Sequence, residues 1–349
     1  MRIYKNVFDK IISLENLFSA WDKFKSDKQK KWDVQKFEWR LEENIFQLHR
    51  DLKYGRYKHG AYTSFYIRDP KQRHIHKATV RDRILHHAVF TVLNPIFEPT
   101  FISNSLSCRI GKGTHKGIYI LEKILLQTSS NTFKPCFALK CEIKKFFETV
   151  DHRILLNIIC KRIKDDDALW LLEEIIESFS SQYSTLFERK GLPIGNLTSQ
   201  LFANIYLNEF DQFVKHKLKV KRYVRYTDDF IIVAGNKLYL ENIIAPIHSF
   251  LAKKLALELH PKKITIRKFR QGIDFLGYIV LPHHRLLRTK TKQRIFRKLE
   301  KRIKEYKNGV ISKQTLEQSF QSYFGVFSHA NTYKLGQKLK NQSWFWLTE

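Results

Sequence analysis

Two adjacent aspartates, Asp228 and Asp229, lie between the apolar segments Tyr223–Tyr226 and Phe230–Ala234. Tight turns between strands favour Asn-Gly or Asp-Gly, and like charges at close range repel each other. A pair of acids there predicts a positive partner, and a divalent metal ion is the simplest one because carboxylate oxygens suit Mg²⁺ or Mn²⁺. The alternative is an ordinary solvated turn, which is the commoner meaning of such a pair in isolation.

A third acid, Glu142, lies near the end of the apolar segment Phe137–Ile143, which predicts a buried strand. Two metal ions about 3.5–4 Å apart can clamp the attacking and leaving oxygens of a phosphoryl transfer, and they need carboxylates from at least two elements. The alternative for Glu142 is a glutamate at a strand end that forms a salt bridge. We predict that the three acids converge on a pair of metal ions.

The charge of the chain indicates what it acts on. Its 349 residues carry 63 Lys+Arg against 34 Asp+Glu, a formal charge of +29, and 43% of them are hydrophobic, enough for a sizeable core. Such an excess predicts a polyanionic partner, with nucleic acid ahead of an anionic membrane surface. We expect neither a membrane span nor secretion, and the four cysteines without CxxC spacing favour a reducing cytosol over a zinc ribbon or a disulfide scaffold.

Hydrophobic periodicity and turn residues predict the elements that position the acids. In the first part of the chain we expect helices up to about residue 58, a hairpin over 62–75 with its turn at Asp69-Pro70, a helix around 84–92 and a Gly- and Lys-rich loop over 105–117. The middle part should contain a helix capped by Asp151, a loop over 191–196, a long helix over about 198–216 and a hairpin over 223–234. We then expect a helix and a strand over about 241–268, a hairpin over 272–278, and a strongly basic helix over 288–307 followed by two short helical pieces.

From about Tyr62 to Leu335 the chain resembles reverse transcriptases of the prokaryotic retroelement group, and most of all those of diversity-generating retroelements. The resemblance rests on FYIRDPKQRHIHKATVRDRILHHAV, SLSCRIGKGTH, LKCEIKKFFETVDH, GLPIGNLTSQLFANIYLNEFD, RYTDDF, GIDFLGY and SYFGVFSHANTYKL. It implies an α+β right-hand polymerase: a helical N-terminal extension (1–58), fingers (59–134), a ferredoxin-like palm (135–283, with fingers-associated helices at about 152–190) and a basic helical thumb (284–349).

For catalysis, the resemblance implies that Asp228 and Asp229 hold two Mg²⁺ ions, or Mn²⁺ in their place, with the carbonyl of Ile143 as a further ligand. Glu142 stands where the family has aspartate. Its extra methylene displaces the carboxylate by ~1.5 Å, and catalytic geometry is sensitive to shifts near ~1 Å. Reduced activity, a preference for Mn²⁺ and an inactive polymerase all stay open. Lys262 resembles the lysine that protonates the departing pyrophosphate, although its neighbour Lys263 competes for that assignment.

Further residues match positions that bind the deoxynucleoside triphosphate (dNTP). Lys71, Arg73 and Arg81 match the fingers cations that meet the triphosphate. Phe147 matches the aromatic residue beneath the sugar, where a ring would clash with a ribose 2′-hydroxyl. Core packing is the alternative for Phe147, and we assign that role to Phe146 instead.

Two departures in the loop GLPIGNLTSQ resemble the diversity-generating enzymes. Ile194 replaces the usual Gln, and Gln200 replaces the usual Pro. An amide can hydrogen-bond the nascent base pair, whereas isoleucine offers only shape, so weaker discrimination follows. In that family the pattern accompanies misincorporation opposite template adenine. The alternative for Ile194 is simple loop packing.

Other features resemble nucleic-acid contacts. Gly277-Tyr278 resembles the primer grip, and the basic helix resembles a thumb that tracks a duplex backbone through sequence-independent, salt-sensitive contacts. Its cations are Arg288, Lys290, Lys292, Arg294, Arg297, Lys298, Lys301 and Arg302. Near the N-terminus, aromatic residues among lysines could stack unpaired RNA bases, although core packing is the commoner role. They are Tyr4, Phe8, Trp32 and Trp39.

The sequence therefore predicts an RNA-directed DNA polymerase of a diversity-generating retroelement, which makes error-prone cDNA from a template-repeat RNA. A defence-type or intron-like reverse transcriptase and, because of Glu142, a catalytically impaired RNA-binding scaffold are the alternatives. The resemblance implies as partners an RNA template, the RNA/cDNA duplex, dNTPs, a structured retroelement RNA and a small basic, oligomeric accessory protein. We expect a cytoplasmic protein, prokaryotic or phage-encoded, without a membrane partner.

Overall fold

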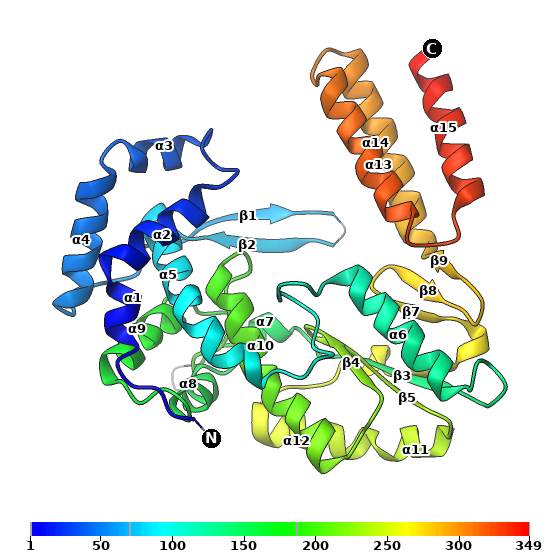
Figure 1. Ribbon diagram of the computed structural model, residues 1–349, viewed down its shortest axis with the longest axis horizontal. Coiled ribbons are helices and arrows are strands. Elements are labelled where there is room, and N and C mark those ends of the chain that lie inside the picture. The colour runs from blue at the N-terminus through cyan, green and yellow to red at the C-terminus, as the bar shows by residue number, and fades with distance from the viewer. Residues whose placement is uncertain (1, 70, 186–187, 349) are drawn as a thin grey trace.

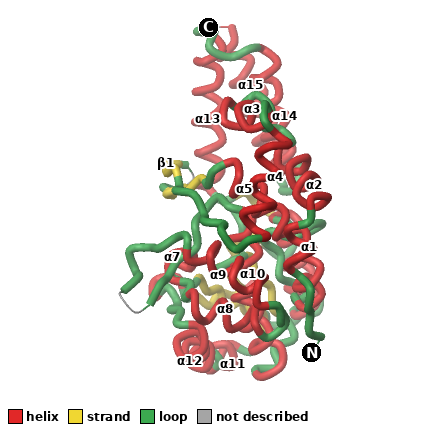
Figure 2. The backbone as a smooth tube through the Cα atoms, turned by 90° about the vertical axis from the view of Figure 1, so that its left-hand side faces the viewer, coloured by secondary structure: helices red, strands yellow, loops and turns green. Residues whose placement is uncertain are grey.

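The computed structural model describes residues 2–69, 71–185 and 188–348, with side chains up to residue 341. Helices and strands are mixed along the chain. Figure 1 shows the N-terminal helices and the three C-terminal helices on opposite sides of the molecule. In the view of Figure 2 the C-terminal helices rise at one end, and α11 and α12 lie at the other.

The first part of the chain is helical, as the periodicity predicts. Its helices are α1 (Phe8–Ile12), α2 (Leu14–Lys25), α3 (Trp32–Glu38) and α4 (Leu41–Lys53). Ser13 caps α2 by accepting a hydrogen bond from the backbone N–H of Asn16 at 3.2 Å. Leu17 and Trp21 of α2 are buried, and α2 packs against α5 (Val80–Phe97).

The expected hairpin consists of β1 (Thr63–Ile67) and β2 (Arg73–Lys77), which pair antiparallel. The predicted turn at Asp69-Pro70 falls partly outside the described residues, because Pro70 is not among them. The hairpin extends away from the N-terminal helices, with its tip toward the C-terminal helices (Figure 1).

The central sheet has four antiparallel strands in the order β4-β5-β3-β6. They are β3 (Phe137–Glu142), β4 (Tyr223–Tyr226), β5 (Asp229–Ala234) and β6 (Thr265–Lys268). Leu139 and Cys141 of β3 face one core, shared with the helices α10 and α12, whereas Ala138 faces a second core, shared with α6 and a smaller sheet. The alternation of side chains along β3 thus lets one strand serve two cores.

The helices that complete these cores follow the predicted pattern in part. Asp151 caps α8 by accepting from the backbone N–H of Ile154, as predicted. The expected loop over 105–117 ends earlier, because α6 begins at Thr114 directly after Gly113, whose φ of 110° terminates the irregular segment. The helices and short turns here are α6 (Thr114–Thr128), α7 (Phe146–Thr149), α8 (His152–Cys160), α9 (Asp166–Glu177), α10 (Leu197–Gln212), α11 (Lys237–Asn242) and α12 (Ile244–Leu255), with short helical turns at Glu98–Thr100, Phe213–Lys217, Pro261–Lys263 and Phe269–Gln271.

Near its C-terminus the chain departs from two expectations. The predicted hairpin over 272–278 is a three-stranded sheet of β7 (Ile273–Phe275), β8 (Tyr278–Val280) and β9 (Arg285–Leu287). The basic helix is confirmed as α13 (Thr289–Lys307), but the two pieces after it are not short. They are α14 (Lys313–Phe327) and α15 (Tyr333–Thr348), which are extended by packing against α13 and each other.

Candidate active site

The sheet brings the three predicted acids together in the backbone. Glu142, at the end of β3, lies directly opposite Asp229, the first residue of β5. Asp228 occupies the β4–β5 turn, and its carbonyl accepts a hydrogen bond from the backbone N–H of Ile143 at 3.0 Å. Two distant segments are thereby joined at one point of the sheet.

The electrostatics of this point indicate an uncompensated negative charge. Burial, together with the charges of Asp229 and Glu142, raises the pKa of Asp228 to about 6. Burial also raises the pKa of Asp229, an effect that Lys140 opposes. Oδ1 of Asp229 is buried without a hydrogen-bond partner. Because an unpaired buried carboxylate oxygen is costly, the two aspartates fit a cation.

Glu142, however, is already paired. Its Oε1 contacts Nζ of Lys263, which is the salt bridge considered above as the alternative for this glutamate. Across residues 2–69, 71–185 and 188–348, no three acidic, histidine or cysteine side chains are gathered closely enough to hold a metal ion. The backbone register thus aligns the three acids at one end of the sheet. The side chain of Glu142, however, pairs with Lys263.

Lys263 and the predicted Lys262 line the same cavity beside Glu142. The cavity measures about 220 Å³, and its other cations are Lys140 and Arg267. Of the two neighbouring lysines, Lys263 forms the ion pair with Glu142. The sequence could not distinguish them, because their side chains are identical.

The predicted triphosphate-binding cations lie in two places. Lys71 lies between β1 and β2, and its charge opposes the rise in the pKa of both Asp228 and Asp229. Arg73 begins β2 in an exposed position. The structure does not bring Arg81 to this group: its guanidinium pairs with Asp51 at 2.8 Å, on the side of the N-terminal helices.

Two neighbouring aromatic residues differ in burial. Phe146 is 2% exposed and belongs to the core, as predicted. Phe147 is only partly buried, its ring centroid lies 5.5 Å from that of Phe146, and its carbonyl accepts from the backbone N–H of Leu192. Phe147 thus packs against the core while part of its side chain stays accessible.

The loop 191–196 leads into α10 and contacts the β1–β2 hairpin. The carbonyl of Ile194 accepts from the backbone N–H of His76 at 3.0 Å. Gln200 and Asn196 line a cavity of about 330 Å³, and both polar atoms of the buried Asn196 side chain lack a hydrogen-bond partner. The other charged and aromatic residues around this cavity include Phe24, Lys28, Lys31, Phe65, Lys77 and Arg83.

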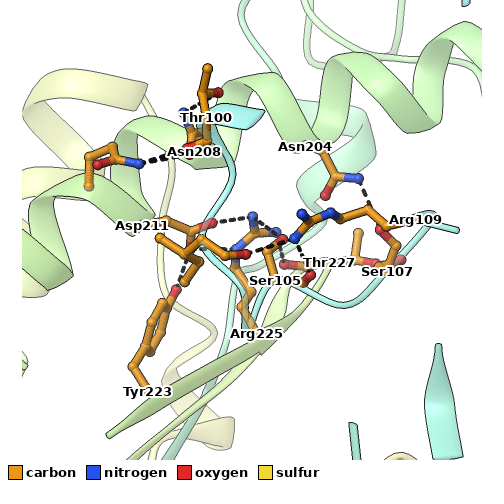
Figure 3. A network of polar contacts seen from close by, with 12 residues as sticks. Thr100, Ser105, Ser107, Arg109, Asn204, Asn208, Asp211, Tyr223, Arg225 and Thr227 are labelled. Carbon is orange, nitrogen blue, oxygen red and sulfur yellow. Dashed lines mark hydrogen bonds and ion pairs between the residues drawn. The ribbon is translucent and has the colours of Figure 1, made fainter. Parts of the chain in front are cut away.

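A buried ion pair holds the turn that carries the aspartates (Figure 3). Arg225 is fully buried and contacts Asp211 of α10 through two hydrogen bonds, of 2.7 and 2.6 Å. Its guanidinium also donates to Oγ of Ser105 at 3.0 Å and to the carbonyl of Thr227 at 3.1 Å. The hydroxyl of Tyr223 donates to Asp211 at 2.8 Å. These bonds connect β4, α10 and the loop before α6.

Thr227, next to the aspartates, has a φ of 53° and is held by its side chain as well. Its hydroxyl donates to Oγ of Ser107 at 2.6 Å, and the carbonyl of Ser107 accepts from the Asn204 amide. This polar network was not predicted. The available signal was an arginine within the otherwise apolar strand of Tyr223–Tyr226.

The predicted primer grip connects two elements. Gly277, with a φ of 89°, joins β7 to β8, and Tyr278 is buried with its hydroxyl donating to the carbonyl of Val326 in α14 at 3.1 Å. Arg288 pairs with Asp274 of β7. On α13, Arg297 and Lys301 are exposed and Lys292 is half-buried, whereas Ile295, Leu299 and Ile303 form the buried face.

Two tryptophans on the N-terminal helices are exposed. The exposed fraction is 73% for Trp32 and 88% for Trp39, so core packing is the wrong role for both. Phe8 is buried in the core, so the core-packing alternative is confirmed for this residue.

Acidic residues at adjoining strand ends, with Oδ1 of Asp229 unpaired, are groups of the kind that bind divalent cations. Residues 67–280 match the family described as Reverse transcriptase (RNA-dependent DNA polymerase). The chain belongs to this family, and the match contains Glu142, Asp228 and Asp229. Residues 67–280 therefore form a domain of the reverse transcriptase family.

Similar curated proteins include intron-encoded ones. Protein YkfC of Escherichia coli is 28% identical over 61% of this chain and 62% of its own length. The group II intron-encoded protein LtrA of Lactococcus lactis is 26% identical over 87% of this chain and 58% of its own length. The chain thus spans about three fifths of either relative. A solved structure of apo telomerase from Candida tropicalis has a TM-score of 0.48 and 13% identity, covering 70% of this chain and 60% of that chain. No helix in the described part of the chain has the length and apolar character of a membrane span.

Proposed function

We propose that the protein is the reverse transcriptase of a diversity-generating retroelement, which makes error-prone cDNA from a template-repeat RNA in the cytoplasm. The observation that carries this proposal is the register that sets Glu142 opposite Asp229, with Asp228 in the adjoining turn. In this proposal the β1–β2 hairpin belongs to the fingers, the four-stranded sheet is the palm, and α13–α15 form the thumb.

The chain's own residues then have distinct tasks. Asp228 and Asp229 hold the divalent metal, which when bound stabilises the charge that develops on the transferred phosphoryl group. Lys71, whose charge acts on both aspartates, receives the triphosphate of the dNTP. The exposed cations of α13 contact the phosphates of the RNA/cDNA duplex, independently of base sequence.

Infidelity is assigned to the loop 191–196. The backbone of Ile194 is tied to β2 through its carbonyl, and its aliphatic side chain contributes shape without a hydrogen bond. We assign to this loop the misincorporation opposite template adenine.

The proposed partners beyond the substrate are a structured RNA and a small basic accessory protein. The exposed Trp32 and Trp39, on a chain of charge +29, support RNA binding by the N-terminal helices. Two basic proteins repel each other, so the RNA would bridge this chain to the accessory protein.

Primer extension tests the function. The full chain is incubated with a primed RNA template of mixed sequence, dNTPs and either Mg²⁺ or Mn²⁺, and the cDNA is sequenced. We expect extension that Asp228→Asn abolishes, with errors concentrated at template adenines. A low error rate that is equal at all four template bases would favour an intron-like reverse transcriptase, to which the similarity with LtrA already points.

No extension with either metal, together with tight RNA binding, would identify an RNA-binding scaffold. The contact between Glu142 and Lys263 favours this second candidate, because it occupies the third carboxylate. Glu142→Asp is the matched control, since a gain in rate would identify the glutamate as the cause.

A further inference from the structure

We propose that Lys263 is a built-in counter-cation of Glu142, which competes with the divalent metal ion for this carboxylate. The inference rests on the proposed metal site at Asp228 and Asp229. It explains why the backbone aligns three acids while the side chains do not gather around one point.

The position of Lys263 is fixed by the backbone. Lys263 ends the helical turn Pro261–Lys263, immediately before β6. The strand β6 pairs with β3 on the edge opposite β5, so the turn that carries Lys263 lies on the β6 side of β3, although the charge of Lys263 also acts on Asp229. The backbone N–H of His260 donates to the carbonyl of Glu142 at 2.8 Å, which ties this turn to the end of β3.

The side chain at position 142 decides which cation it meets. Glu142 is 18% exposed and Lys263 is 37% exposed, so the pair is partly shielded from water. An aspartate would withdraw the carboxylate by ~1.5 Å toward the strand, away from an ammonium that comes from the neighbouring turn. The glutamate and Lys263 therefore form a matched pair.

Two cations at one carboxylate repel each other, so a metal ion that uses Glu142 must displace Lys263 or share the carboxylate with it. Among the residues whose side chains are described, neither Asp228 nor Asp229 forms an ion pair, and Oδ1 of Asp229 is without a hydrogen-bond partner. The aspartates are thus available to the metal, and the contribution of Glu142 depends on the release of Lys263.

Metal binding without nucleic acid tests this role. The full chain is titrated with Mn²⁺, and free Mn²⁺ is measured by electron paramagnetic resonance. We expect Lys263→Met to tighten Mn²⁺ binding by roughly two- to fivefold, as for the loss of a competing, partly exposed ion pair. Lys262→Met is the matched control, because it removes the same charge from the same cavity but leaves the ion pair between Lys263 and Glu142 in place. The Mn²⁺ affinity of this variant should stay near that of the wild type.

The effect must also depend on the glutamate. In a Glu142→Gln background, Lys263→Met should tighten Mn²⁺ binding clearly less than it does with Glu142, because only the effect of the Lys263 charge on Asp229 remains. Circular dichroism checks that each variant is folded. Equal effects of Lys263→Met and Lys262→Met, or equal tightening with Glu and with Gln at position 142, would overturn the counter-cation role. Mn²⁺ binding that Asp228→Asn does not weaken would overturn the metal site and this inference with it. Tightening by Lys263→Met in a chain that fails to extend primers would support the inference while the proposed function fails.

Discussion

At the scale of single residues, the division between Phe146 and Phe147 leads to a prediction about sugar selection. Phe147→Ala removes the ring that would meet a ribose 2′-hydroxyl, so ribonucleotides should be admitted. We expect the ratio of kcat/KM for a ribonucleotide to that for the matching deoxynucleotide to rise at least about tenfold, a change of about 1.4 kcal/mol in discrimination. Single-nucleotide extension measures both constants.

The neighbouring residue supplies the control. Phe146 is buried, so Phe146→Leu should lower the free energy of unfolding by about 1 kcal/mol and leave the sugar ratio near its wild-type value. If Phe146→Leu changed the ratio as much as Phe147→Ala, the side chain at position 147 would not be the gate.

The sequence predicted the positions of the acids in the site but not the partners of all its charged residues. Adjacent acids in a turn and an acid at a strand end predicted that Asp228, Asp229 and Glu142 would converge, because strand pairing brings strand ends together. The backbone register agrees with this expectation. The partner of Glu142 was not predictable, since Lys262 and Lys263 have the same chemistry and only the geometry of a three-residue turn selects between them. Arg81 likewise carries a suitable charge, but its place on α5 directs it to Asp51.

At the scale of elements, the ion pair between Arg225 and Asp211 should determine the stability of the turn. Arg225→Met leaves the buried Asp211 carboxylate without its partner, so we expect a loss of about 3–5 kcal/mol in the free energy of unfolding. Asp211→Leu combined with Arg225→Met replaces the pair by apolar side chains and should recover most of the loss. Urea denaturation measures both variants.

The same double variant separates stability from positioning. It lacks the hydrogen bond from Arg225 to the carbonyl of Thr227, so primer extension should stay impaired although stability returns. A double variant as unstable as Arg225→Met would contradict the proposed cause of the loss. Full activity in the double variant would show that the bond to Thr227 does not position the turn.

Element boundaries were predictable where the pattern is long. The alternation over 62–75 and the tight turn between apolar segments over 223–234 predicted the two hairpins, and the strongly basic helix over 288–307 was predicted as well. The strands β7–β9 have three residues each, too few for a period of two to be recognised. The lengths of α14 and α15 depend on packing with α13, which no local pattern contains.

At the scale of the whole molecule, the hairpin tip and α13 meet although both are strongly basic. Asp69 at the tip pairs with Lys298 of α13 at 2.5 Å, and Lys298, Arg294 and Arg297 together hold the pKa of Asp69 below its usual range. The contact joins elements far apart in the chain, which lie close together in Figure 1. Phosphates of a bound duplex would compete with Asp69 for the same cations.

We therefore expect Asp69→Asn to speed the association of a fluorescent RNA/DNA duplex about two- to fivefold at low salt, since the loss of a partly exposed ion pair frees Lys298. Stopped-flow kinetics measures the rate. Glu300→Gln adds the same charge to α13 without touching the hairpin, because Glu300 pairs with Lys304 inside that helix, so a smaller effect is expected. Exchanging the charges, with Asp69→Lys and Lys298→Asp together, should restore slow association at unchanged net charge. If Glu300→Gln sped association as much as Asp69→Asn, net charge alone would set the rate and the contact between hairpin and helix would have no part in loading.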